Sequence, residues 1–325
     1  MKRVIIDTDP GIDDAAAIFC ALTSGVLQVE ALTTVFGNVE VEQTTRNALC
    51  LLEVAGRSDI PVYQGTARPL IREPNFAKFI HGKNGLGDIE IAPPSSIPAP
   101  GGAVEAIISR IMSAPGDITL IALGPLTNLA LALTLEPRAA RNLRELILMG
   151  GAVSTWGNVT PAASANLYND PEAARIVYHA GVPMVQVGLD VCRPIVISHA
   201  NLARIREADT PMGRFLLRMT PFIEQAYRKR GVKVVLEGRG VQYNDVVCIA
   251  YAIKPDMFTT ENLYVEIETH GAFTLGETVA DFEGRWGKEP NTRVCLGADV
   301  RGVAELFTEC LSRPLGGMKG PELQA

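Results

Sequence analysis

The chain has 325 residues, of which 47% are hydrophobic and 20% charged, with a net charge of −6 and an isoelectric point near 5.4. This composition is that of a globular protein with a large core, and the lack of a long basic run disfavours binding to nucleic acid or an anionic membrane. No apolar run reaches membrane-spanning length and the first residues already form a strand-like run, so we expect a cytoplasmic protein without a signal peptide.

Short β-branched runs alternate with amphipathic helical runs along the chain. The predicted strands are Arg3–Ile6, Val29–Val35, Ile60–Tyr63, Ile118–Leu123, Glu145–Met149 and Val182–Val187. The predicted helices between them are Val41–Ala55, Ala103–Ser113, Leu126–Leu135 and Pro171–Ala180. This alternation predicts an α/β fold, with an open, mostly parallel, Rossmann-like sheet and helices on both faces. We expect a single domain over residues 1–312, with insertions near 70–100 and 220–245, and a disordered tail over 313–325.

Four aspartates, Asp7, Asp9, Asp13 and Asp14, lie between the first strand and the apolar helical run that follows it. Carboxylates at the start of a helix cap backbone N–H groups, which explains one or two of the four. Grouping all four lowers folding stability unless a cation lies between them, and hard divalent cations prefer oxygen ligands. Because open α/β sheets bind ligands at the carboxyl ends of their strands, the cluster predicts a metal site at this turn.

Two downstream segments carry further polar residues. Asp245 precedes the apolar run Val246–Ala252, where N-capping of a buried helix would explain it. The loop over residues 156–171 is dense in asparagine, which suggests hydrogen bonds to a polyhydroxylated ligand, although several Asx turns would explain it as well. Neither segment identifies a site by itself.

Together these segments resemble the calcium-dependent nucleoside hydrolases of the inosine–uridine preferring type, from Arg3 to about residue 311. The most specific match is Asp7–Ala15, which reads DTDPGIDDA. The further matches, in chain order, are Thr33–Asn38, His81–Asp88, Ala122–Asn128, Leu148–Gly151 and Asn169–Ala174. The resemblance implies an open α/β sheet with its site at the strand carboxyl ends, and an enzyme that hydrolyses N-ribosidic bonds.

The resemblance also implies roles for individual residues. The Ca²⁺ ligands that it implies are Asp9, Asp14, Asp245 and the backbone carbonyl of Leu123. It makes Asp9 the general base that takes a proton from the attacking water. The sugar ligands that it implies are Asp13, Asn38, Asn166 and, at the 5′ end, Asn158. Variable loops, here residues 75–88 and 222–243, would contact the base of a small N-riboside, and the family tends to form homodimers or homotetramers.

Asn244 departs from the family pattern, in which a histidine usually precedes the downstream calcium aspartate. An amide cannot act as a general acid near neutral pH. Three explanations stay open. The proton comes from another residue, which is Tyr227, Tyr243 or His81, or the leaving group needs no proton, as with a positively charged nicotinamide. In the third explanation turnover is lost and the protein only binds ribosides. Because the acidic metal site is complete, we favour an altered donor or leaving group over an inactive protein.

Ser164 is the second departure, because the family has a glutamate two residues before Asn166. The change removes a negative charge near the 5′ end of the sugar. Five basic residues lie within residues 228–239. Together these features suggest a substrate with a 5′ substituent such as a phosphate, whereas the alternative is that the basic residues form a solvated helix face.

The remaining candidates are weaker. Trp156, beside Asn158, either stacks on a base or fills the underside of its loop, and His81 lies in a glycine-rich loop able to close over a substrate. The other three histidines and the six scattered cysteines lie outside the matched motifs, and we expect surface histidines and buried, reduced thiols. A phosphohydrolase using the Asp-x-Asp pair is disfavoured, because the downstream lysine and aspartates that it requires cannot be placed.

Overall fold

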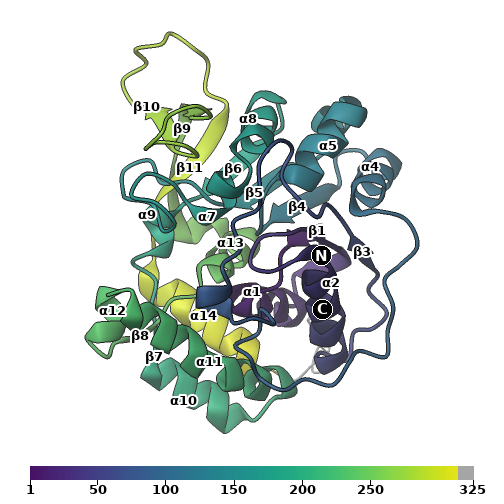
Figure 1. Cartoon of the computed structure of the whole chain (residues 1–325), viewed down its shortest axis with the longest axis vertical. Helices are drawn as coiled ribbons and strands as arrows, with labels where there is room; N and C mark the ends of the chain where they lie inside the picture. The colour runs from purple at the N-terminus through teal and green to yellow at the C-terminus, as the bar shows by residue number, and fades with distance from the viewer. Residues whose placement is uncertain (314–325) are drawn as a thin grey trace, which may run out of the picture.

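A computed structural model describes residues 1–313, so the predicted tail lies almost wholly outside the described residues. The strands are β1 (Lys2–Thr8), β2 (Leu27–Thr34), β3 (Val62–Gln64), β4 (Ile118–Ala122), β5 (Glu145–Met149), β6 (Met184–Val187), β7 (Ile197–Ser198), β8 (Gly240–Val241), β9 (Phe258–Ile267), β10 (Thr278–Asp281) and β11 (Thr292–Ala298). Nine of these strands form one sheet in the order β10-β9-β11-β6-β5-β4-β1-β2-β3, and β7 pairs with β8 (Figure 1).

The sheet is parallel from β3 through β11, and only β9 runs against its neighbours β11 and β10. The predicted mostly parallel α/β sheet is therefore confirmed, and each predicted strand and helix is present within two residues of its expected bounds. The sequence missed the edge formed by β9, β10 and β11. The first half of β9 is exposed and polar, so it lacks the apolar run that marks a buried parallel strand.

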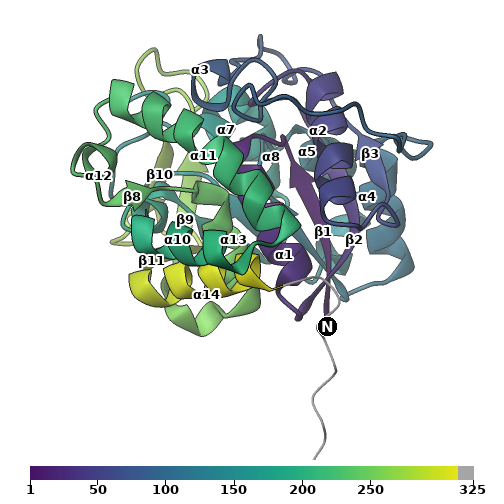
Figure 2. The same cartoon turned by 90° about the horizontal axis from the view of Figure 1, so that it is seen from below.

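Helices cover both faces of the sheet. Their bounds are α1 (Ile12–Thr23), α2 (Val41–Val54), α3 (Lys78–His81), α4 (Ala103–Ser113), α5 (Thr127–Leu135), α6 (Arg138–Asn142), α7 (Ala165–Asn169), α8 (Pro171–His179), α9 (Leu189–Cys192), α10 (His199–Ala208), α11 (Pro211–Lys229), α12 (Lys233–Leu236), α13 (Asn244–Ile253) and α14 (Val300–Ser312), with a 3₁₀ turn η1 (Pro255–Met257). One core joins α1, α2, α10, α11, α13 and α14 to one face, and a second core joins α4, α5, α6 and α8 to the other. Figure 2 looks onto α10, α11 and α14, which cover the first of these faces.

The order β3-β2-β1-β4-β5-β6 reverses direction between β1 and β4. Chain connections leave these two strands toward opposite faces, so their carboxyl ends border a crevice of the kind that binds ligands in doubly wound folds. Asp9 follows β1 and Leu123 follows β4, and the Leu123 N–H donates to the Asp7 carbonyl at 2.7 Å. The fold therefore gathers the polar turn residues around one point.

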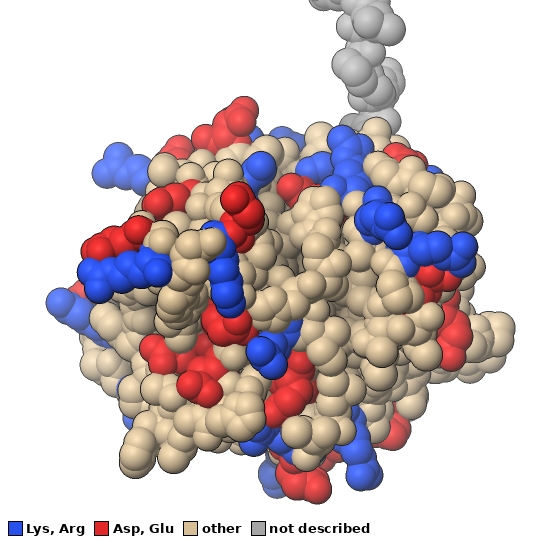
Figure 3. Space-filling view, turned by 90° about the horizontal axis from the view of Figure 1, so that it is seen from above, with Lys and Arg blue, Asp and Glu red and all other residues tan. Residues whose placement is uncertain are grey.

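The surface and the cysteines match an ordinary globular chain. Among residues 1–313, no helix combines the length and apolarity that crossing a bilayer requires. Figure 3 shows basic (blue) and acidic (red) side chains interspersed over one face, so many charges have an opposite charge nearby. All six cysteines are buried and unbridged, as expected, and His179, His199 and His270 are exposed.

Candidate functional site

A cavity of about 540 Å³ lies at the carboxyl ends of the central strands, a volume typical of small-molecule sites. The predicted site residues on its wall are Asp13, Asn38, His81, Leu123, Trp156, Asn158, Asn166, Tyr227, Asn244 and Asp245. Four predicted residues, Asp9, Asp14, Ser164 and the candidate donor Tyr243, are not part of the wall. The tertiary structure thus collects ten of the predicted residues, from seven separate segments, around one space.

Asp14 holds the turn between β1 and α1 in shape. Its Oδ1 accepts a hydrogen bond from Thr8 Oγ1 at 2.6 Å, and its Oδ2 accepts from the Gly11 N–H at 3.0 Å and from Asn38 Nδ2 at 2.9 Å. Capping therefore accounts for this aspartate. A Cβ atom at Gly11 would lie 2.6 Å from both the Asn38 and His81 side chains, so only glycine lets them approach the turn.

Asp9 lies behind the cavity wall, enclosed by backbone. Its Oδ2 accepts the Asn38 backbone N–H at 2.7 Å, whereas its Oδ1 is buried without a hydrogen-bond partner. A Cβ atom at Gly37 or Gly124 would come within 2.1 Å or 2.6 Å of this carboxylate, so both glycines make room for it. Burial raises the pKa of Asp9 well above its usual value, and repulsion from Asp14 raises it further.

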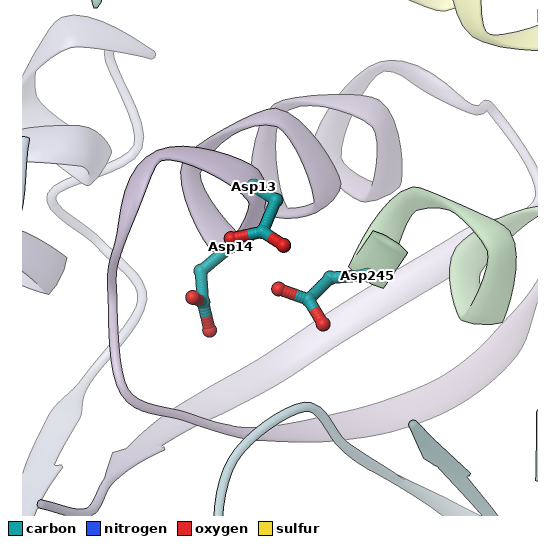
Figure 4. Close-up of side chains that lie close together, drawn as sticks. All are labelled: Asp13, Asp14 and Asp245. Carbon is teal, nitrogen blue, oxygen red and sulfur yellow. The ribbon is translucent and has the colours of Figure 1, made fainter. Parts of the chain in front are cut away.

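Asp13, Asp14 and Asp245 offer carboxylate oxygens that all lie within 4.8 Å of one another. Figure 4 shows Asp13 and Asp14 on the first turn of α1 and Asp245 at the start of α13, with the Asp13 carboxylate turned toward that of Asp245. Burial raises the pKa of all three groups, that of Asp13 to about 6. Three buried carboxylates at this separation repel one another strongly, and a cation held between them would remove that cost.

This acidic cluster differs from the predicted ligand set in one respect, because it contains Asp13 and leaves Asp9 outside. Asp9 is still close enough for its charge to raise the pKa of Asp245. The unpartnered Oδ1 atoms of Asp9 and Asp13 and the purely oxygen donor set fit a hard divalent cation. The Leu123 carbonyl accepts a hydrogen bond from Asn166 Nδ2 at 2.5 Å, and a carbonyl oxygen retains a second lone pair.

The asparagine loop brings amides to the cavity and turns Ser164 away from it. Asn166 also donates to the Met149 carbonyl at 3.0 Å, and Asn158 Oδ1 accepts the Ala165 N–H at 2.8 Å. Ser164 is 1% exposed, and its Oγ accepts the Gly151 N–H at 2.8 Å. Asn158 is therefore fixed by a hydrogen bond within the loop and Asn166 by bonds to the ends of β4 and β5, while Ser164 stabilises the turn after β5.

The three candidate proton donors lie in different surroundings. His81 is buried on the wall, its Nδ1 accepts the Ile12 N–H at 3.1 Å, and burial lowers its pKa to about 4, so it is neutral at pH 7 with its proton on Nε2. Tyr227 also lines the cavity, and its hydroxyl makes no hydrogen bond within residues 1–313. Tyr243 is not on the wall, and its hydroxyl is bonded to Thr220 Oγ1 at 2.8 Å. Of the three candidate donors, only His81 and Tyr227 therefore lie on the cavity wall.

The outer wall is aromatic and basic. Trp156 is 66% exposed and does not fill the underside of its loop, and the Arg193 guanidinium lies 4.7 Å from its ring centroid. Phe79 is 53% exposed and lies 4.8 Å below the Arg230 guanidinium. Sequence reasoning missed Phe79 and Arg193. The aromatic residues within 75–88, a loop expected to contact the base, could have identified Phe79 as a wall residue. No sequence pattern distinguishes Arg193 from other surface arginines.

Comparisons with known proteins agree with this geometry. The profile of the family described as inosine-uridine preferring nucleoside hydrolase matches residues 4–305. The non-specific ribonucleoside hydrolase RihC of Salmonella typhimurium is 42% identical over 309 residues, which cover 94% of this chain and 97% of that protein. The probable uridine nucleosidase 2 of Arabidopsis thaliana is 38% identical over 319 residues, which cover 95% and 97%.

Solved structures show the same likeness. A plant nucleoside hydrolase, PpNRh1, superposes with a TM-score of 0.91 at 36% identity, covering 96% of this chain and 99% of that one. A purine-preferring ribonucleoside hydrolase from Gardnerella vaginalis superposes with a TM-score of 0.90 at 31% identity, covering 96% and 98%.

Proposed function

The chain belongs to the inosine-uridine preferring nucleoside hydrolase family and is an N-glycosyl hydrolase, and from this premise we propose that it is a calcium-dependent enzyme that releases the free base and ribose from ribonucleosides. The observation that carries the metal dependence is the buried cluster of Asp13, Asp14 and Asp245 at the base of a cavity lined by amides. Calcium suits this cluster because it accepts many oxygen ligands in loose geometry.

The residues that would hold calcium are Asp9, Asp14, Asp245 and the Leu123 carbonyl. When bound, calcium supplies a positive charge that holds ribose hydroxyls and lowers the pKa of a water molecule. Asp9 would act as the general base, taking a proton from the attacking water at its Oδ1, which has no hydrogen-bond partner within the described residues. The backbone around Gly37 and Gly124 excludes bulk water from this carboxylate and fixes its position.

The cavity wall would orient the sugar. Asp13 faces the cavity with an unpartnered Oδ1, and Asn38 and Asn166 present amides held by hydrogen bonds to the backbone, so these side chains accept and donate to ribose hydroxyls. Asn158 contacts the 5′ end. The excess of carboxylates on this side also favours the positive charge that develops on the sugar as the N-glycosidic bond breaks.

A base-release assay tests this function. Purified enzyme is given uridine, inosine and nicotinamide riboside, with calcium and with a chelator. Calcium-dependent release of base from at least one of them is expected. Release that is equally fast in the chelator, or no release from any of these ribosides, would contradict the proposal.

We propose that Tyr227 donates the proton to the leaving base, in place of the family histidine for which Asn244 is substituted. Tyr227 lies on the cavity wall and carries its proton at pH 7, because burial and the charges of Asp13 and Asp245 raise its pKa, whereas His81 at pH 7 is a neutral imidazole. Tyr227→Phe is expected to lower kcat for uridine by about 10²-fold, the lower end of the range for general acid catalysis. Turnover of 4-nitrophenyl riboside, whose leaving group departs as a stable anion, should change little.

The matched control for this variant is His81→Gln, which alters the other wall residue able to donate a proton. If His81→Gln causes the larger loss with uridine, and again little loss with the nitrophenyl riboside, His81 is the donor and the assignment to Tyr227 is wrong. Equal losses on both substrates would indicate a role of Tyr227 in binding alone.

A further inference from the structure

One side of the cavity is cationic. The basic side chains on its wall are Arg193, Arg230, Lys233 and Arg239. Glu237 pairs with Arg239 at 2.7 Å and lies 3.8 Å from Lys233. Within residues 1–313, neither Arg193 nor Arg230 has a carboxylate oxygen within 4.0 Å. These two guanidinium groups therefore lie on the cavity wall without a direct ion pair, although the charge of Asp190 still acts on Arg193.

The two arginines converge on the same loop from different parts of the chain. Arg193 Nη2 donates to the carbonyls of Trp156 at 2.9 Å and Gly157 at 2.7 Å, and Arg230 Nη2 donates to the carbonyl of Asn158 at 3.0 Å. Each guanidinium also lies over an aromatic ring, of Trp156 and Phe79 respectively. These contacts use one nitrogen of each group and hold its plane in place, so the remaining N–H donors are free for a ligand.

Arg193 has a buried N–H group that lacks a hydrogen-bond acceptor within the described residues. Its Nε is buried and forms no hydrogen bond within the described part of the chain, although a buried donor on a charged group is costly to leave unpaired. Burial also lowers the pKa of this guanidinium, which indicates that it is partly removed from water. An anion beside such a group is attracted more strongly than one at a fully solvated arginine.

We propose that Arg193 and Arg230 form an anion subsite that accepts the 5′-phosphate of a ribonucleoside 5′-monophosphate. This inference rests on the proposed function, because that function places the 5′ end of the ribose at Asn158, next to both arginines. A phosphate monoester offers about two negative charges and several acceptor oxygens, which planar guanidinium donors bind well. Lys233 and Arg239 add positive charge at the same side of the cavity.

Calorimetry with ribose 5-phosphate and ribose tests the subsite without any turnover. The calcium-loaded enzyme is expected to bind ribose 5-phosphate at least about tenfold more tightly than ribose, the ratio that one charge-assisted hydrogen bond supplies. The ratio should fall about tenfold in Arg230→Gln and shrink when the ionic strength rises from about 0.05 to about 0.5 M. Arg228→Gln is the matched control, because Arg228 is exposed in the last turn of α11, two residues before Arg230, and does not line the cavity.

Base release from uridine and from its 5′-monophosphate then separates the two proposals. A preference for ribose 5-phosphate together with a kcat/KM ratio of monophosphate to uridine that falls in Arg230→Gln supports the subsite. Release from uridine with equal affinity for ribose and ribose 5-phosphate, or with no binding of ribose 5-phosphate, overturns the subsite and leaves the proposed function standing. An Arg230-dependent preference without base release from any nucleoside supports the subsite and contradicts the proposed function.

Discussion

Asp9→Asn is expected to lower kcat for ribonucleoside hydrolysis by 10²- to 10⁴-fold, about the contribution of a general base. The amide retains an oxygen that can accept the Asn38 N–H, so the turn between β1 and α1 should keep its shape. The amide cannot take a proton from water near pH 7. Initial rates of base release at saturating uridine measure the loss, and the melting temperature reports whether the variant is folded.

The control for this variant is Asp256→Asn, because Asp256 is exposed and remote from the cavity wall. That substitution is expected to leave kcat within a factor of about two, as surface changes usually do. If Asp9→Asn retains more than about a tenth of wild-type kcat, another residue is the base. If its calcium-dependent rise in melting temperature is lost along with activity, loss of Asp9 as a calcium ligand explains the drop in kcat, and the role as general base is not supported.

The calcium-free enzyme is expected to become less stable as the pH rises from about 4 to about 7. Burial raises the pKa of both Asp7 and Asp13 to about 6, above the value of about 3.9 expected in the unfolded chain. A group whose pKa is raised by folding stabilises the native state below its unfolded pKa, and that contribution is lost as the pH passes its folded pKa. A shift of this size corresponds to about 3 kcal/mol per group, so the two groups together outweigh the opposite contribution, about 3 kcal/mol, of His81, whose pKa burial lowers to about 4.

Calcium should reverse this trend, because the cation binds the deprotonated carboxylates. At a calcium concentration of about 100 times Kd, the free energy of unfolding at pH 7 should rise by about 2.7 kcal/mol. Denaturation by urea at pH 4, 5, 6 and 7, with calcium and with a chelator, measures both effects. Asp245→Asn should remove most of the calcium effect, whereas Asp256→Asn should not. Stability that is unchanged by calcium at pH 7 would contradict the metal site.

Local sequence determined the first half of the site. The segment from Thr8 to Asp14 forms its own turn, because the Asp14 side chain bonds to Thr8 and Gly11 only a few residues away. Such contacts depend on residue type and spacing, so a strand, an acidic turn and a helix were predictable there. The alternation of apolar runs likewise predicted the parallel sheet, since the central strands β4 and β5 are buried over all or nearly all of their length.

Only the tertiary structure decided how the distant parts meet. The strand order brings the ends of β1 and β4 together, and the packing of α13 against α1 carries Asp245 to Asp13 and Asp14. It also places Asp9 behind the wall.

The same packing determined which polar and basic side chains line the outer part of the cavity. Ser164 accepts a hydrogen bond from Gly151 and does not line the cavity, although its match to the family pattern predicted a position near the 5′ end of the sugar. Arg193 and Arg230 both lie on the cavity wall. These outcomes depend on long-range packing and on hydrogen bonds between segments that no local pattern encodes. The sequence by itself therefore predicted the acidic cluster, while the folded chain determined which of its carboxylates line the cavity and where the cationic side of the cavity lies.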